Sequence, residues 1–380
     1  MGSCWTWDAR RGQYYLHNFL GSQPDLNVHN RDVQDALIDT ARFWLDRGVD
    51  GFRLDAINFT MHNPELTDNP SVETAGKRTR PFDFQHHFHN QSHPDIPAFL
   101  ERLRGVIDTY PGRFTVAEVG GEQADAEMKL YTQGDARLDS AYGFNFLYAD
   151  ALTPGLVRET IDLWPGAPDE SWPSWAFSNH DAPRAVSRWR GRHDADACAR
   201  LALLLLFALR GNIFLFQGEE LGLPQADVPF ERLQDPEAIE NWPQTLGRDG
   251  ARTPMPWCAD APHAGFSTGE PWLPVDPAHV RLAVDRQEAE SSSILHLTRR
   301  LIALRRGNAA LRDGTIRLIE APEPLVAFER GDGDARRLCV FNLGDVAATW
   351  PLDGWRILEG VGDGGPDRLP PLSGFIAAPA

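Results

Sequence analysis

Cysteine is scarce in this sequence. The 380 residues include four cysteines, and no two of them are close enough to form a C-x-x-C pair: Cys4, Cys198, Cys258 and Cys339. This spacing excludes a recognisable zinc knuckle or disulfide framework. Reduced thiols are the usual state in a cytosolic protein, so we expect a cytoplasmic location.

Long hydrophobic runs are also lacking. The longest, Leu201–Leu209, is nine residues long and lies between Arg200 and Arg210. A run of this length is too short to span a bilayer and indicates a buried helix. The first residues, MGSCWTWDARRGQYY, contain no apolar segment of the kind found in secretory signals. We therefore expect neither a membrane partner nor secretion.

Basic residues are outnumbered by acidic ones. The chain has 37 Lys and Arg against 54 Asp and Glu, which gives a formal net charge of −17 and a pI near 5.1. Nucleic acids and anionic membranes require a basic face, so we do not expect them as main partners. A neutral substrate such as a sugar is compatible with this charge. The 12 tryptophans fit a sugar ligand weakly, because core packing also explains them.

Strand-like and helix-like segments alternate over the first 220 residues. Helical spacing of apolar residues predicts helices, and short β-rich runs predict strands. The expected helices are 30–47, 97–109, 153–163 and 194–210, and the expected strands are 49–55, 113–118, 140–147 and 174–181. A last strand is expected to open into a loop within 212–220. This order favours a parallel sheet or a (β/α) barrel.

The pattern changes after residue 220. The stretch 221–293 is rich in Pro, Trp and Asp, and connections of this length are usually functional. An amphipathic helix is predicted over 294–306. Short alternating segments separated by Gly-Asp turns then predict a small antiparallel β-domain. We therefore expect an α/β domain over 1–308, with the insertion 221–293, and a β-domain over 309–380.

Acidic residues end three of the predicted strands. In GVDGFRLDAIN (48–58), Arg53 and Asp55 face the same way, about 6.6 Å apart along an extended chain. Glu118 ends the second strand, and Asn179-His180-Asp181 ends the third. Taken singly, these groups are explained by a local salt bridge or a turn. Strand ends of a parallel barrel meet at one rim, so together they predict an active site.

Paired carboxylates suggest a specific chemistry. A retaining glycosidase needs two carboxyl groups about 5–5.5 Å apart. Arg53 would favour the charged form of Asp55, as a nucleophile requires. Less polar surroundings would raise the pKa of Glu118, as a general acid requires. Asp181, with His180, would bind sugar hydroxyls and stabilise positive charge at the anomeric carbon.

Six motifs carry a resemblance to a known family. GFRLDAIN, TVAEVG and FSNHD resemble the three catalytic regions of glycoside hydrolase family 13, the α-amylase family. QGEELGLP (217–224) resembles the region after its eighth strand. GRDGARTPMPW (247–257) and GQYYLHNFLGSQPDLN (12–27) resemble its α-glucosidase and oligo-1,6-glucosidase branch. The resemblance covers essentially the whole chain.

The resemblance implies a role for each candidate site residue. Asp55 would be the nucleophile, Glu118 the general acid/base and Asp181 the transition-state stabiliser. The substrate-binding residues would be Arg53, His180 and Arg248 on the terminal glucose, Phe144 in the pocket wall, and Ala56, where this branch tunes linkage choice. The implied activity is that of a retaining exo-α-glucosidase that hydrolyses, or transfers, terminal α-linked glucose of maltose-like oligosaccharides or α-glucosides.

The resemblance also reveals a departure from the family. Family members begin with three further βα units and an inserted domain, whereas Met1 falls in the loop before the fourth strand. We therefore predict a (β/α)8-type TIM barrel of about five βα units, whose open edges an oligomer would cover. The chain would be a fragment, a mis-started reading frame or a short protein. The alternative function is a catalytically inactive fragment or a non-enzymatic scaffold.

No cofactor or metal is expected. The cation site of this family branch lies in its first βα loop, ahead of Met1. The histidine-rich stretch QHHFHNQSH (85–93) favours a polar loop over a metal site, because Pro94 and the Asn-Gln-Ser composition argue against a helix there. Glu219 and Glu220 form another acid pair, and the resemblance makes them loop residues that shape the pocket.

Overall fold

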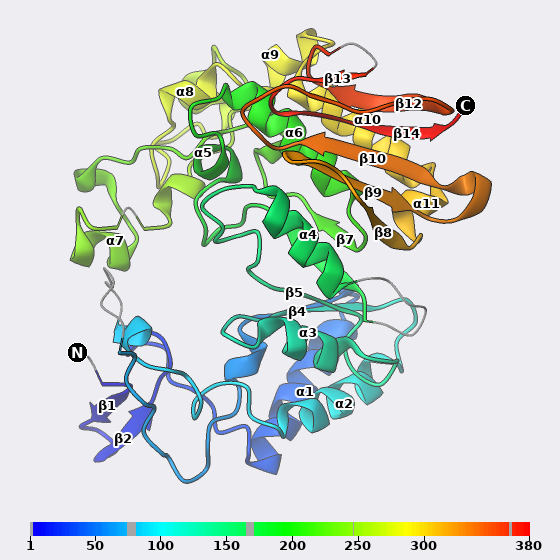
Figure 1. The fold of residues 1–380 in the computed structure, drawn as a ribbon. Coiled ribbons are helices and arrows are strands. Elements are labelled where there is room, and N and C mark those ends of the chain that lie inside the picture. Colours follow the sequence, from blue (N-terminus) through cyan, green and yellow to red (C-terminus); the bar gives the residue numbers. More distant parts are fainter. Residues whose placement is uncertain (1–2, 74–80, 165–170, 246, 365–366) are drawn as a thin grey trace. The chain divides into compact units, whose positions relative to one another are not determined.

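The computed structural model describes residues 3–73, 81–164, 171–245, 247–364 and 367–380. The chain divides into two compact units (Figure 1). The first comprises Met1–Phe144 with Asp169–Trp172, and the second comprises Asn145–Pro168 with Pro173–Ala380. Each unit is described by itself.

Three parallel strands form the centre of the first unit. They pair in the order β3–β4–β5, with Arg53 beside Val116 and Glu118 beside Tyr142. An N-terminal antiparallel hairpin precedes them, and helices α1, α2 and α3 lie beside the strands (Figure 1). The elements are β1 (Trp5–Asp8), β2 (Gln13–Leu16), α1 (Arg31–Leu45), β3 (Gly51–Leu54), η1 (Ile57–Phe59), η2 (Pro81–Phe84), α2 (Ile96–Ile107), β4 (Phe114–Glu118), α3 (Ala124–Thr132) and β5 (Ser140–Tyr142).

Local sequence explains the start of β3. Helix α1 begins after Asn30, whose side chain accepts a hydrogen bond from the Asp32 amide, and it buries Ile38 and Leu45 on one face. Gly51 then opens β3 with φ of +153°, and a Cβ there would come within 1.7 Å of the Phe114 carbonyl oxygen. Only glycine permits this approach of β3 to β4.

The second unit begins with helices around a parallel strand pair, β6 and β7. The elements are α4 (Pro154–Leu163), β6 (Pro173–Ala176), α5 (Ala185–Trp189), α6 (Ala195–Ala208) and β7 (Asn212–Phe214). Helix α6 starts at Asp194, whose carboxylate accepts hydrogen bonds from two amides of the first turn. It is apolar on every side and almost entirely buried from Cys198 onward, as its composition predicts.

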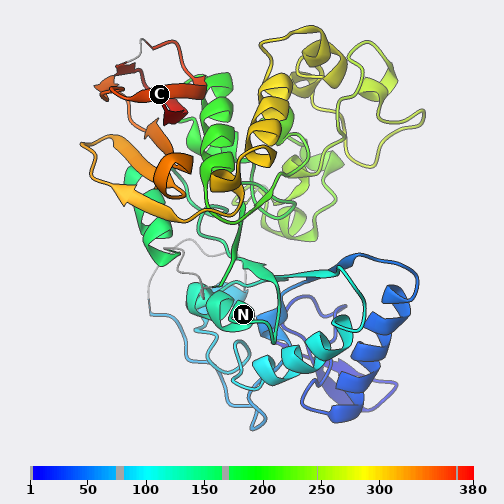
Figure 2. The same ribbon diagram turned by 90° about the vertical axis from the view of Figure 1, so that its right-hand side faces the viewer.

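The predicted insertion contains short helices rather than long elements. They are η3 (Glu219–Leu221), η4 (Phe230–Arg232), α7 (Pro236–Asn241), η5 (Asp249–Ala251), η6 (Pro262–Gly265), α8 (Pro277–Val280) and α9 (Val284–Ala289). Helices α10 (Ile294–Arg306) and α11 (Ala309–Arg312) follow. Helix α10 packs against α6, and the two stand side by side in Figure 2.

An antiparallel sheet completes the second unit. Its order is β12–β14–β10–β9–β8, and β11 pairs with β13 separately. The strands are β8 (Ile316–Ile319), β9 (Leu325–Arg330), β10 (Arg337–Asn342), β11 (Ala348–Thr349), β12 (Trp355–Val361), β13 (Arg368–Leu369) and β14 (Ser373–Pro379), with η7 (Gly333–Ala335) between β9 and β10. Helix α6 packs against β10, β12 and β14 (Figure 2).

Two arginines close the carboxyl end of α6. Arg330 is fully buried and its Nη1 donates to the Ala208 carbonyl at 2.6 Å. Nη1 of Arg305 donates to the carbonyls of Phe207 and Leu209 at 2.7 and 2.8 Å. The last carbonyls of a helix have no partner within it and carry partial negative charge, so guanidinium groups stabilise this end.

The predicted α/β class, with parallel strands followed by an antiparallel sheet, is confirmed. The strand predictions 140–147 and 174–181 ran too far, because β5 and β6 end at Tyr142 and Ala176. The strand expected to open into a loop within 212–220 is β7, which ends at Phe214. The division at residues 308 and 309 remains a prediction. Among the described residues, no helix has the length and apolar character needed to cross a membrane.

Candidate active site

Arg53 connects two carboxylates in the first unit. Its Nη1 lies 2.5 Å from Oδ1 of Asp55, and its Nη2 lies 2.9 Å from Oε2 of Glu118. Arg53 is on β3, Asp55 directly follows that strand, and Glu118 ends the neighbouring parallel strand β4. The structure thus brings these three sequence-predicted residues together, at the carboxyl ends of adjacent strands.

The two carboxylates differ in environment. The side chain of Asp55 is 73% exposed, whereas that of Glu118 is 9% exposed. Burial raises the pKa of Glu118, and a hydrogen bond with Asp55 raises it further, against the opposing effect of Arg53. An accessible carboxyl group paired with an arginine therefore stands beside a buried carboxyl group that retains its proton to a higher pH. Two unlike carboxyl groups of this kind can divide the roles of nucleophile and acid.

Tyr142 completes this group, and the sequence analysis did not identify it. Its hydroxyl accepts hydrogen bonds from Nε and Nη2 of Arg53 at 3.0 and 2.8 Å. The same hydroxyl donates to Oε1 of Glu118 at 3.2 Å. Burial raises the pKa of Tyr142, so its hydroxyl stays protonated. The available signal was a tyrosine in a strand predicted to follow the Glu118 strand.

Ala56 contacts Glu118 through its backbone. It adopts the left-handed conformation (φ 42°, ψ 42°), and its amide donates to Oε2 of Glu118 at 3.2 Å. A left-handed alanine is strained, and such strain concentrates at functional sites. Ala56 therefore helps to fix the carboxyl group of Glu118.

Phe144 and two amides support the loop that follows Glu118. The ring of Phe144 lies against Gly120, where a Cβ would come within 2.6 Å of it. Nδ2 of Asn58 and Nε2 of Gln91 both donate to the Gly120 carbonyl, at 2.7 and 2.6 Å. Asn58 and Gln91 were not predicted. Their contacts hold the backbone two residues beyond Glu118.

A second group of charged residues lies in the second unit, after β6. Asp181 is contacted by Nη2 of Arg252 at 2.9 Å and by Nη1 of Arg248 at 3.4 Å. Nε2 of His180 lies 3.2 Å from its other oxygen. Asn179 forms the turn, because its Oδ1 accepts the Asp181 amide at 2.9 Å. The structure thus places the predicted residues His180, Asp181 and Arg248 together.

Two residues of this second group were missed. Asp235, whose side chain is 0% exposed, accepts from Nη2 and Nε of Arg248 at 3.0 and 3.1 Å. Burial alone would raise the pKa of Asp235, but its bonds with Arg248 lower it. Arg252 approaches Asp181 more closely than Arg248 does. Arg252 belongs to the GRDGARTPMPW segment. That segment contains both arginines, and the sequence alone does not indicate which of them lies nearer to Asp181.

Glu219 lies outside both groups. Its Oε2 accepts the Phe216 amide at 2.8 Å, and it lines a water-sized cavity with apolar side chains that include Phe177 and Leu206. Burial raises the pKa of Glu219 to about 7, against the lowering effects of its hydrogen bonds and of Arg184. Oε2 of Glu220 accepts the Gly218 amide at 2.7 Å. Both acids hold the loop at η3 through backbone amides.

Glu219 should make stability depend on pH. Its pKa rises from 4.5 to about 7 on folding, so its favourable contribution is complete below pH 4.5 and is lost as the pH passes 7. We expect Glu219→Gln, which keeps an acceptor for Phe216, to remove about 2–3 kcal/mol of this pH dependence. Urea unfolding of both proteins at pH 5 and pH 8 measures it. Parallel pH profiles would contradict the assignment.

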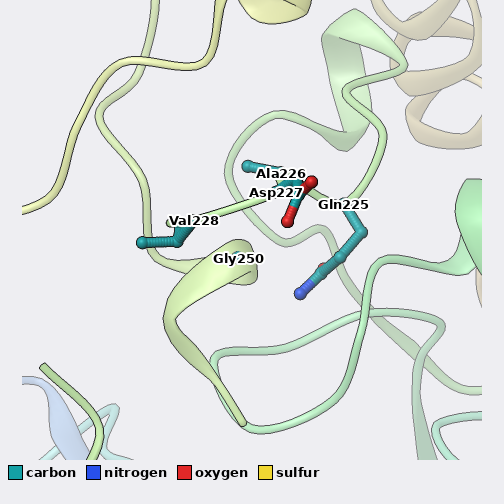
Figure 3. A pocket seen from close by; sticks show the side chains of 5 residues that line it. All are labelled: Gln225, Ala226, Asp227, Val228 and Gly250. Carbon is teal, nitrogen blue, oxygen red and sulfur yellow. The ribbon is translucent and has the colours of Figure 1, made fainter. Parts of the chain in front are cut away.

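A small polar pocket elsewhere offers no room for an organic substrate. It is lined by Gln225, Ala226, Asp227, Val228 and Gly250 (Figure 3). The Ala226 amide donates to the Gly250 carbonyl at 3.1 Å, and a Cβ on Gly250 would come within 2.4 Å of the Ala226 oxygen. The remaining space admits about one water molecule.

Comparison with known proteins identifies the family. The family model described as "Alpha amylase, catalytic domain" matches residues 1–314. The chain is 46% identical over 371 residues to the "Probable alpha-glucosidase" of Rhizobium meliloti (strain 1021), covering 95% of this chain and 67% of that protein. It is 32% identical over 399 residues to the "Oligo-1,6-glucosidase" of Heyndrickxia coagulans, covering 94% and 70%. The chain belongs to the alpha-amylase family, glycoside hydrolase family 13.

Similarity to solved structures supports the same family. The structure of the alpha-glucosyl transfer enzyme XgtA is similar with a TM-score of 0.91 and 43% identity, covering 100% of this chain and 73% of that one. The trehalulose synthase MutB of Pseudomonas mesoacidophila MX-45 has a TM-score of 0.83 and 28% identity, covering 99% and 74%. The chain thus spans about two thirds to three quarters of the length of these relatives.

Proposed function

We propose that this protein is a retaining exo-α-glucosidase that removes terminal α-linked glucose from maltose-like oligosaccharides or α-glucosides. The observation that carries the proposal is the pair of unlike carboxylates on Arg53. Asp55 is exposed and pairs with the guanidinium, whereas burial raises the pKa of Glu118. A retaining mechanism requires this combination of an available nucleophile and a protonated acid.

The proposed reaction has two steps. An Oδ atom of Asp55 attacks the anomeric carbon while the bond to the leaving oxygen breaks, and Glu118 transfers its proton to that oxygen. Glu118, now ionised, then takes a proton from water as the water oxygen attacks the anomeric carbon and releases Asp55. Arg53 stays cationic throughout: burial alone would lower its pKa, but its contacts with Tyr142, Glu118 and Asp55 raise it.

The second group has roles in the same reaction under this proposal. Asp181 stabilises positive charge at the anomeric carbon, and His180 and Arg248 bind hydroxyls of the terminal glucose. Phe144 contributes to the pocket wall, and Ala56 influences linkage choice. These roles rest on the family motifs, and no step requires a cofactor or metal. Each can be tested by single substitution.

Transfer of glucose is a second candidate activity. The glucosyl-Asp55 intermediate can be attacked by an acceptor alcohol in place of water, with Glu118 as the same general base. Similarity to a structure described as an alpha-glucosyl transfer enzyme, at 43% identity, favours this possibility specifically. A non-catalytic scaffold, by contrast, gives no reason for an exposed Asp55 beside a buried Glu118.

The wider setting is also part of the proposal. We infer a cytoplasmic protein whose partners are oligosaccharides or α-glucosides, with no nucleic-acid partner, in line with its net charge of −17. A second copy would cover an exposed strand edge of the sheet. Light scattering of the purified chain measures this assembly.

Turnover of 4-nitrophenyl α-glucoside by the purified 380-residue chain tests the function. We expect nitrophenol release, and proton NMR of the fresh reaction should show α-glucose before mutarotation, because two displacements retain configuration. Addition of maltose should yield longer glucosides if transfer competes with hydrolysis. A folded, monodisperse chain without turnover would favour the scaffold or inactive-fragment alternative.

Tyr142 should lower the pKa of the proposed general acid, Glu118. Its hydroxyl stabilises the ionised form of Glu118, so Tyr142→Phe removes a donor and raises the pKa of Glu118. We expect kcat to fall about tenfold and the alkaline limb of kcat/KM to move up by up to about one pH unit. Tyr110→Phe, on a partly exposed tyrosine whose hydroxyl donates to Asp46, is the matched control. If the alkaline limb of the kcat/KM profile stays at the same pH, Tyr142 has only a packing role.

A further inference from the structure

Three loops of the first unit bring histidines together. His29 precedes the first turn of α1, His62 follows η1, and His93 precedes α2. The rings of His29 and His93 have centroids 4.7 Å apart, and those of His29 and His62 are 5.3 Å apart. Of the stretch QHHFHNQSH, only its last histidine belongs to this cluster. None of the three takes part in the group around Arg53.

One carboxylate joins the cluster. A ring nitrogen of His29, a ring nitrogen of His93 and a carboxylate oxygen of Asp95 all lie within 4.8 Å of one another. Nδ1 of His93 is 3.7 Å from Oδ2 of Asp95. Ligand atoms at 2.0–2.2 Å from a tetrahedral Zn²⁺ lie roughly 3.4 Å apart. A small movement of the Asp95 side chain, which is 68% exposed, would close the difference.

The position of Asp95 is unusual. It is the N-cap of α2, where an aspartate normally accepts a hydrogen bond from an amide of the first turn. Its side chain makes no such bond. Its own backbone amide instead donates to Nδ1 of His93 at 3.2 Å. A capping residue thus forgoes its usual contact and keeps its carboxylate next to an imidazole.

The tautomer of His29 is fixed as a metal ligand requires. Its Nε2 lies 2.6 Å from the backbone carbonyl of His62, which can only accept, so Nε2 carries the hydrogen and Nδ1 keeps its lone pair. Histidines that bind metals usually donate their second N–H to a carbonyl or carboxylate in this way. Nδ1 of His93 also keeps its lone pair, because it accepts the Asp95 amide at 3.2 Å, and a metal ion would replace this contact.

We propose that His29, His93 and Asp95 form a binding site for a divalent cation of the zinc type. Imidazole nitrogens with one carboxylate suit Zn²⁺ better than Mg²⁺ or Ca²⁺, and a fourth position remains for water or another ligand. The bound ion would fasten the loop before α1 to the loop before α2. An ion that binds the folded state and not the unfolded state would raise the thermal midpoint of the protein.

Calorimetric titration of the untagged, chelator-dialysed chain with zinc chloride tests the site. The tested chain carries Cys4→Ser and Cys258→Ser, which removes the exposed thiols as competing ligands. We expect one zinc ion per chain and a higher thermal midpoint. His93→Ala and Asp95→Asn should each weaken binding at least about tenfold while leaving the metal-free thermal midpoint near its original value. Absence of binding, or unchanged binding by both variants, would overturn the proposal.

Two further variants test the ligand set. His89→Ala removes a nearby histidine outside the cluster and should bind zinc as the parent does. His62→Ala keeps the backbone carbonyl that orients His29, so it should also retain binding. Loss of binding in His62→Ala would show that the assigned ligands are wrong. A Co²⁺ spectrum without a thiolate charge-transfer band would agree with nitrogen and oxygen ligands.

Discussion

Asp55→Ala is expected to lower kcat for 4-nitrophenyl α-glucoside by about 10³-fold or more, because the variant lacks the proposed nucleophile. Arg53, Glu118 and Tyr142 should keep their mutual contacts, so the variant should remain folded. Asp50→Ala is the matched control, because Asp50 is 95% exposed at the other end of the same segment and pairs with Arg113. Similar losses in both variants would contradict a specific role for Asp55.

Azide can separate the roles of the two carboxylates. In Asp55→Ala, azide would occupy the place of the missing nucleophile and yield β-glucosyl azide from α-glucosyl fluoride. In Glu118→Ala, azide would instead attack the glucosyl-Asp55 intermediate from the opposite side and yield α-glucosyl azide. The two products differ in configuration, so NMR assigns each residue directly. Rescue with the reverse configurations would exchange the proposed roles.

Arg330→Met is expected to destabilise the second unit by about 3–5 kcal/mol. Its guanidinium makes four bonds to carbonyls: Nε to Thr315, Nη1 to Ala208, and Nη2 to Leu311 and Gly314, at 3.1, 2.6, 2.9 and 3.0 Å. Methionine fills a similar space but removes all four bonds, so the carbonyls of Ala208, Leu311 and Gly314 lose this donor, whereas the Thr315 carbonyl keeps the Gly331 amide at 2.9 Å. Burial lowers the pKa of Arg330 to about 9, so it is still charged at pH 7.

Arg317→Met is the matched control for this substitution. Arg317 lies on the neighbouring strand β8, is 70% exposed and pairs with Glu329 at the surface. Exposed pairs of this kind contribute about 0–1 kcal/mol. Urea unfolding followed by circular dichroism compares the variants. Equal unfolding midpoints for Arg330→Met and Arg317→Met would show that the buried bonds contribute little.

Strongly periodic elements could be predicted from the sequence, and short ones could not. Helix α10 occupies 294–306 as expected, because apolar residues recur at helical spacing. The strands of the parallel sheet are three to five residues long, and their apolar runs continue into buried loops. Phe146 and Phe177 lie just beyond β5 and β6 and are 2% and 1% exposed. The predicted strands were therefore too long, because buried loop residues continue the apolar pattern of the strands.

The site residues that lie in recognisable sequence motifs could be predicted. Arg53, Asp55 and Glu118 follow a recognisable pattern, and the structure brings them together. Tyr142 lies beside Glu118 because the register of β4 and β5 pairs these two residues. No local sequence pattern predicts this pairing. Asp235 precedes helix α7 and reaches Arg248, 13 positions further along the chain. Contacts made by folding distant segments together leave little trace in a single sequence.

The left-handed backbone at Ala56 limits how this enzyme could be engineered. Under its proposed role in linkage choice, position 56 would be varied in a library aimed at linkage preference, yet its amide also donates to Oε2 of Glu118. Valine or isoleucine tolerates φ of 42° poorly and would shift that amide. Selection for a new glycosidic linkage at this codon would therefore also select a new pH optimum, and screens run at one fixed pH would discard useful variants.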